Sequence, residues 1–101
     1  MKELKGSQRK YLRGMAHKLN PAAVVGQKGV TQALIDEIDT ALTAVELIKI
    51  RFQDHKDKEV KTALAEEICR RENCHLAGMI GHVAVLYRQH SDPEKRQVRL
   101  P

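Results

Sequence analysis

Two kinds of hydrophobic spacing alternate along the chain, and this alternation restricts the fold more than any other feature. Strand-like runs at 22–25 and 47–52 are separated by a segment with helical spacing. Another segment with helical spacing precedes two more strand-like runs at 75–80 and 83–88. A strand that is followed by a helix and then by another strand needs a crossover connection. The pattern therefore predicts an α/β fold with helices packed on a parallel or mixed sheet.

Three segments have the apolar spacing of amphipathic helices. The first follows Ser7, a candidate N-cap, and ends at Asn20-Pro21; the others follow Thr31 and Asp57. Their apolar positions are Tyr11, Leu12, Met15, Ala16 and Leu19 in the first, Leu34, Ile35, Ile38, Ala41, Leu42 and Val45 in the second, and Val60, Ala63, Leu64 and Ile68 in the third. The expected order is helix, strand, helix, strand, helix, strand, strand, arranged as a two-layer α/β sandwich.

The run at 47–52 is typical of a half-buried strand. Ile48, Ile50 and Phe52 alternate with Leu47, Lys49 and Arg51. We expect the first set to face the core beneath the second and third helices, and the second set to give the strand a basic outer face.

A chain of 101 residues is long enough for one domain and not for two. The sequence becomes polar from His90 onward, and Asp92-Pro93 suggests the end of the compact part. We therefore expect a single domain at 1–90 and a basic, polar C-terminal tail at 91–101.

Basic residues outnumber acidic ones by 18 to 13, a net charge of +5. Six basic residues and one acidic residue give residues 1–20 a net charge of +5, whereas residues 21–48 carry one basic and four acidic residues, a net charge of −3. This separation of charge favours a polyanionic partner. With two Tyr, one Phe and no Trp, the chain offers few rings for base stacking.

Several other functions have little support in the sequence. Cys69 and Cys74 lack the second ligand pair of a zinc site, and no histidine stands in a recognisable catalytic signature. No apolar run reaches the length of a membrane span, and the N-terminus does not resemble a signal peptide. We expect a cytoplasmic, monomeric protein that is not an enzyme and has no cofactor, metal, small-molecule substrate or membrane partner.

Two glycine pairs and the first helix are the candidate binding elements. The segment Gly26-Gln27-Lys28-Gly29 leads into a helix N-terminus, where backbone amides favour an anion, although an ordinary strand-to-helix turn explains it as well. Gly78-Met79-Ile80-Gly81 has the G-x-x-G spacing of loops that clamp a nucleic-acid backbone, and a strand junction is again the alternative. The first helix gathers Arg9, Lys10, Arg13 and His17 on one face.

These segments, in this order, resemble the CRM domain (chloroplast RNA splicing and ribosome maturation) in its stand-alone bacterial form, the YhbY family. The resemblance covers roughly residues 4–90 and is carried by Arg9-Lys10-Tyr11-Leu12-Arg13 with Ala16 and Leu19, by Pro21 with Val25-Gly26-Gln27-Lys28-Gly29-Val30-Thr31, by Glu46-Leu47-Ile48-Lys49-Ile50, and by Gly78-Met79-Ile80-Gly81-His82-Val83-Ala84-Val85-Leu86-Tyr87-Arg88.

The resemblance implies a four-stranded mixed sheet with three helices, like the C-terminal domain of translation initiation factor three. It also implies RNA binding, with the bacterial proteins associated with precursors of the large ribosomal subunit, and it places the family's G-x-x-G loop at Gly78–Gly81. Relatives commonly have Gly-Lys-x-Gly in the first glycine loop, where this chain has its lysine one place later, at Lys28.

We therefore expect an RNA-binding protein that acts on ribosomal RNA of large-subunit precursors during ribosome assembly. The alternative is an adaptor whose basic face docks an acidic protein partner. The expected RNA-binding residues are Arg9, Lys10, Arg13, His17, Lys28, Lys49, Arg51, Gly78, Met79, Ile80, Gly81, His82 and Arg88.

Overall fold

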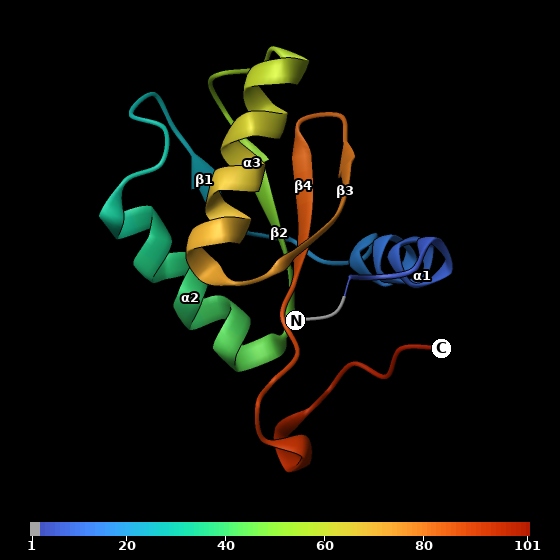
Figure 1. The fold of residues 1–101 in the computed structure, drawn as a ribbon. Helices are drawn as coiled ribbons and strands as arrows, with labels where there is room; N and C mark the ends of the chain where they lie inside the picture. Colours follow the sequence, from blue (N-terminus) through green and yellow to red (C-terminus); the bar gives the residue numbers. More distant parts are fainter. Residues whose placement is uncertain (1–2) are drawn as a thin grey trace.

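A four-stranded mixed sheet in the order β1-β2-β4-β3 forms the centre of the computed structural model, which describes residues 3–101 (Figure 1). The strands are β1 (Pro21–Val25), β2 (Leu47–Phe52), β3 (His75–Ile80) and β4 (Val83–Tyr87), and the helices are α1 (Gly6–Ala16), α2 (Gln32–Val45), α3 (Lys58–Glu72) and the short η1 (Pro93–Lys95). Strand β1 is parallel to β2, and β4 is antiparallel to β2 and β3. The predicted α/β class and order of the elements before η1 are confirmed.

Helices α2 and α3 cover one face of the sheet. Ile48, Ile50 and Phe52 are at most 2% exposed and form a core with apolar residues of both helices, as their alternation predicts. Burial of the apolar side chains of this core supplies most of the driving force for folding.

Helix α1 packs on the opposite face of the sheet, so the molecule has three layers and the predicted two-layer sandwich is wrong (Figure 1). Leu12 and Ala16 of α1 form a second core with Leu47, Val85 and Tyr87. Leu47 and Val85 belong to the strand faces that point away from α2 and α3. An alternating strand exposes apolar residues to both sides, and each side needs its own cover.

The helix boundaries follow local capping interactions. The Thr31 hydroxyl accepts a hydrogen bond from Leu34 N, and the Asp57 carboxylate accepts from Glu59 N and Val60 N, so both predicted N-caps are confirmed. Ser7 is not an N-cap, because α1 begins at Gly6 and Lys5 N donates to Gln8 Oε1 instead. No helix within residues 3–101 combines the length and apolar character needed to cross a membrane.

The buried stripe of α3 differs from the predicted one. Its buried residues are Lys61, Ala65, Ile68 and Glu72, whereas Val60 is 41% exposed and Ala63 is also exposed. Lys61, Ala65, Ile68 and Glu72 lie at spacings of four, three and four, which place them on one helix face. A stripe that starts and ends with charged residues is not visible as an apolar pattern.

The C-terminal segment packs against the domain. The sequence suggests instead that the compact part ends near Asp92. Val98 is 6% exposed in the second core, and Leu100 packs against that core. The buried Glu46 carboxylate accepts hydrogen bonds from the backbone N–H groups of His90, Gln97 and Val98. One buried carboxylate thus connects the end of α2 to the C-terminal segment.

Candidate nucleic-acid interface

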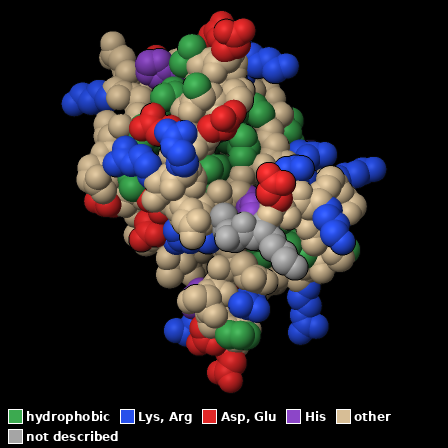
Figure 2. Space-filling model, in the orientation of Figure 1, with side chains coloured by type: hydrophobic (Ala, Val, Ile, Leu, Met, Phe, Trp, Pro, Cys, Tyr) green, Lys and Arg blue, Asp and Glu red, His purple; other side chains and the backbone are tan. Residues whose placement is uncertain are grey.

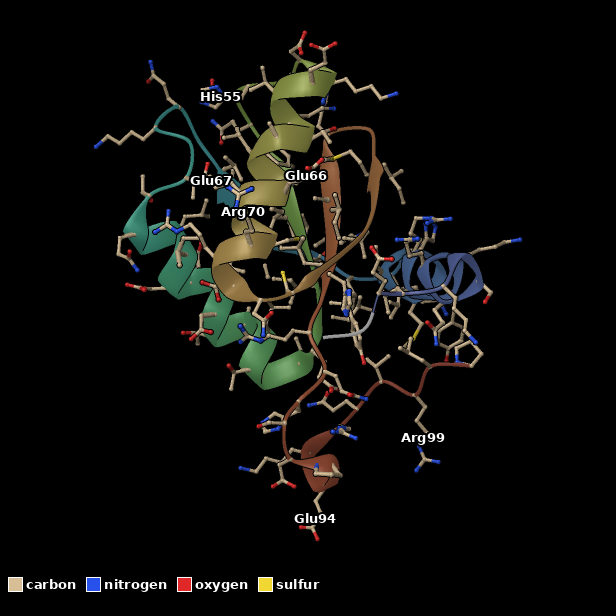
Figure 3. The ribbon with its side chains drawn as sticks, viewed as in Figure 1. His55, Glu66, Glu67, Arg70, Glu94 and Arg99 are labelled. Atoms are coloured by element: carbon tan, nitrogen blue, oxygen red, sulfur yellow. The ribbon has the colours of Figure 1, made fainter. Side chains whose placement is uncertain are left out.

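The carboxyl ends of β1, β2 and β3 lie at one end of the sheet, the upper end in Figure 1. We call the segments 26–29, 53–57 and 81–82 at this end the loop end. They are joined by backbone hydrogen bonds from Gln53 N to Val25 O (3.0 Å) and from Phe52 N to His82 O (2.8 Å). His55, which Figure 3 places at this end, contacts Gln27 O through Nε2 at 2.9 Å. The fold therefore brings three loops, distant in sequence, into one surface.

The first glycine pair forms a true loop between β1 and α2. Gly29 N donates to Gly26 O at 3.0 Å, which closes a tight turn and leaves Lys28 exposed. Gly29 has φ of +69°, a conformation that glycine adopts without the strain of a Cβ. The loop leads to α2, as the sequence predicts.

The second glycine pair does not form a loop, and the expected G-x-x-G loop at 78–81 is wrong. Gly78, Met79 and Ile80 are residues of β3 that pair with Val85, Ala84 and Val83 of β4, and only Gly81, with φ of +60°, lies in the turn. The alternation of Met79 toward the core and Ile80 toward solvent favours strand pairing over an open loop.

Arg13 is held against β3 and does not project freely from α1. Its Nη1 donates to Ala77 O at 2.9 Å, and its side chain is half-buried. Arg9, Lys10 and His17 are exposed, as expected for a binding face. Hence α1 and its C-cap residue His17 present three predicted binding side chains to solvent, and the fourth, Arg13, docks α1 on the sheet.

Lys49 and Arg51 lie on the strand face that α1 covers in part. Lys49 is half-buried, and its Nζ donates to His17 O at 3.4 Å, while Arg51 is exposed near the loop end. On the predicted basic outer face of β2, Lys49 therefore contacts the chain after α1, and Arg51 is open to solvent.

Arg88 lies at the other end of the sheet, away from these residues. Its guanidinium donates to the Glu72 and Asp39 carboxylates at 3.2 and 2.9 Å and to the Thr43 hydroxyl at 3.0 Å. These bonds connect the residue after β4 to α2 and α3, and the structure does not bring Arg88 to the rest of the predicted site.

Lys61 of α3 contacts the loop end and is absent from the residues predicted from the sequence. It is 5% exposed, and its Nζ donates to Gly81 O at 2.6 Å and to His82 Nδ1 at 3.0 Å. An ammonium group has no acceptor, so Nδ1 of His82 is the unprotonated nitrogen. Desolvation and the charges of Lys61 and Lys56 lower the pKa of His82, which favours this neutral ring. The helical spacing of Lys61 from Ala65 and Ile68 is the signal that could have revealed it.

The CRS1/YhbY (CRM) domain model matches residues 4–88 of the chain. The chain belongs to the CRS1/YhbY (CRM) domain family. Among similar proteins, an RNA-binding protein of Haemophilus influenzae is 36% identical over 101 residues, covering 100% of this CRM protein and 98% of the relative. YqeI of Bacillus subtilis, named a probable RNA-binding protein, is 36% identical over 98 residues and covers 97% of this chain and 99% of its own.

A solved structure has the same fold. The solution structure of SAV1595 from Staphylococcus aureus, described as a candidate RNA-binding protein, matches this CRM domain with a TM-score of 0.83 and 31% identity. The match covers 98% of this chain and 100% of SAV1595. The arrangement of three helices and a four-stranded mixed sheet is therefore shared with this relative.

Charge is distributed unevenly over the elements of this CRM domain. Helix α1 contains Arg9, Lys10 and Arg13 and no acidic residue, whereas α2 contains Asp36, Glu37 and Asp39 and no basic residue. Figure 2 shows Lys and Arg side chains projecting around α1, on the right of the view. The outer face of α3 mixes both signs, as Glu66, Glu67 and Arg70 in Figure 3 illustrate. Among the three main helices, α1 is therefore the one that carries positive charge without an acidic residue.

Proposed function

We propose that this CRM domain binds RNA through the exposed cations of α1 and of the loop end. The observation that carries the proposal is that these cations have no carboxylate partner among the residues that the structure describes. Within residues 3–101, the ion pairs that the structure contains involve only Arg71 and Arg88 among the basic residues. Arg9, Lys10 and Lys28 are exposed and free to neutralise phosphates. The names of the relatives support the same function.

Most of the binding free energy in this proposal comes from the RNA backbone. Lysine and arginine contacts to phosphates position the RNA, and the amides of the loop at Gly26–Gly29 add donors beside the α2 N-terminus. The chain has few aromatic side chains on which bases could stack. The finer proposal, which rests on the family resemblance, is that the RNA is ribosomal RNA of large-subunit precursors.

A charge-reversal pair tests the RNA-binding surface. Arg9→Glu with Lys10→Glu changes the net charge by four on α1, and Arg70→Glu with Arg71→Glu makes the same change on α3 as a matched control. Arg71 and Glu67 form an exposed ion pair at 3.7 Å, which adds little stability, so the control variant should fold. The α1 variant should bind structured RNA at least about tenfold more weakly than the control does. An equal loss of RNA affinity in both variants would mean that the affinity depends only on the net charge of the protein.

Two further measurements separate the finer proposal from the adaptor alternative. Sequencing of RNA cross-linked to the protein in cells should recover large-subunit ribosomal RNA above its abundance in the lysate. A salt dependence of RNA affinity near a log–log slope of −1, together with tight binding to an acidic protein, would favour the adaptor.

A further inference from the structure

Four side chains form a continuous row across the sheet near the loop end. Val24 of β1 pairs with Arg51 of β2, Arg51 pairs with Val83 of β4, and Val83 pairs with Ile80 of β3. Directly paired residues project to the same side of a sheet. The row therefore lies on the face that α1 occupies, and we call these four residues the sheet platform.

Helix α1 leaves most of the sheet platform uncovered, and Val83 is half-buried. The second core, which α1 closes, includes Leu47, Val85 and Tyr87 but none of the platform residues. Val24 is 38% exposed, Ile80 is 54% exposed and Arg51 is exposed, whereas the next residues on the opposite face are buried. Phe52 and Ala84, for example, are at most 1% exposed. At this end of the sheet, the face toward α2 and α3 is therefore packed, and the face toward α1 is open to solvent.

We propose that unstacked RNA bases lie on the sheet platform, with Arg51 at its centre. This inference rests on the proposed function and adds the place where bases, rather than phosphates, make contact. Val24, Val83 and Ile80 offer apolar contact to base faces, and a guanidinium plane can stack on a base or bond its edge. Aliphatic contact discriminates little between bases, so binding should depend only weakly on RNA sequence.

The charges around the sheet platform favour RNA over an apolar protein partner. Lys49 lies two residues before Arg51 on the same strand face, and Lys28 lies at the loop end beyond the strands. An apolar partner would bury the Arg51 charge without a counter-ion, which is costly. A single-stranded RNA supplies both a base for the platform and phosphates for the flanking cations.

A double substitution on the platform tests the proposal against a matched control. Val24→Thr with Ile80→Thr keeps β-branched side chains while it removes apolar contact, and Val45→Thr with Val60→Thr makes the same kind of change at exposed sites on α2 and α3. Val45 and Val60 are 44% and 41% exposed, close to Val24. Melting temperatures of both variants establish that each is folded before affinities are compared.

The platform variant should bind a short single-stranded RNA roughly fivefold more weakly, and the control variant should bind as the wild type does. The slope of log affinity against log salt should stay unchanged, because no phosphate contact is lost. Affinity for a duplex of the same length should change less, since its bases are stacked and paired. Arg51→Lys, which keeps the charge but loses the plane, should weaken single-strand binding in the same way.

The possible failures are distinguishable. If the wild type binds neither single-stranded nor duplex RNA, the proposed function itself fails. If the wild type binds and the folded platform variant binds equally well, only the base platform is overturned. A platform variant that changes sedimentation from dimer to monomer would assign the row to contact with a second copy of the chain and would also overturn the proposal.

Discussion

The side chain of Arg13 lies where a side chain on residue 78 would have to be. A Cβ built on Gly78 would come within 2.4 Å of Arg13 Cδ, and the Arg13 guanidinium donates to the neighbouring Ala77 O. The glycine lets a charged helix residue lie flat against β3, which fixes the position of α1 on the sheet. This relationship gives Gly78 a structural role that its G-x-x-G spacing does not suggest.

Gly78→Ala should lower the free energy of unfolding by about 1–3 kcal/mol, because Arg13 must move from its site on β3. Combining Gly78→Ala with Arg13→Ala should cost less than the sum of the two single changes, because the clash disappears with the arginine. Urea denaturation of the four proteins measures this coupling. Strict additivity would show that Arg13 and Gly78 do not interact.

Glu46→Gln should destabilise the protein at pH 7 by about 2–3 kcal/mol, since three backbone N–H groups lose a charged acceptor. Burial raises the pKa of Glu46, but the N–H groups of His90, Val98 and Gln97 lower it more, so that its folded-state pKa lies below the usual value. The stabilisation is therefore present above the ordinary glutamate pKa and is lost as pH falls through the folded value. Denaturation curves from pH 7 to pH 3 should show the two proteins converging in acid.

Removal of residues 91–101 should lower stability by about 2–4 kcal/mol, because the second core loses Val98 and Glu46 loses two of its donors. The measurement is the melting temperature of residues 1–90 against that of the full chain. The same melting temperature for both would support the domain boundary that the sequence suggests.

Ile50→Asp should abolish stable folding, because it buries an unpaired charge at a position that is 0% exposed. Arg51→Asp, one residue later on the open face, should change stability by only about 0.5 kcal/mol. Circular dichroism during thermal unfolding compares the pair. A folded Ile50→Asp variant would contradict the assignment of this strand face to the core.

Lys28→Gln should reduce the steepness of the salt dependence of RNA binding. About five neutralised phosphates on single-stranded RNA give a slope near −3.5, and the loss of one contact changes it by about 0.7. Lys95→Gln, in η1, is the control and should leave the slope as it is. Fluorescence anisotropy at several salt concentrations measures the slope for both variants. An unchanged slope in the Lys28 variant would show that the loop at Gly26–Gly29 is not part of the interface.

The candidate site could be predicted from the sequence only in part. Arg9, Lys10, His17 and Lys28 are exposed as expected, because helix periodicity and a glycine turn decide their exposure locally. Arg88 could not be placed, because its partners Asp39, Thr43 and Glu72 become neighbours only when α2 and α3 pack. The spacing of Lys61 along α3 could have placed it on the buried helix face, but its acceptors, in the turn after β3, become its neighbours only in the tertiary structure.

By itself the sequence determined the identity and order of the strands and main helices, two of the helix caps and the strand face that enters the main core. These features depend on residues within about four positions of one another, where side-chain spacing and capping chemistry act. Only the tertiary structure decided that α1 covers the second face of the sheet, that Arg13 docks on β3 and that the C-terminal segment returns to Glu46. Each of these rests on a contact between residues far apart in the chain, 64 positions in the case of Arg13 and Ala77, and no local pattern encodes such a contact.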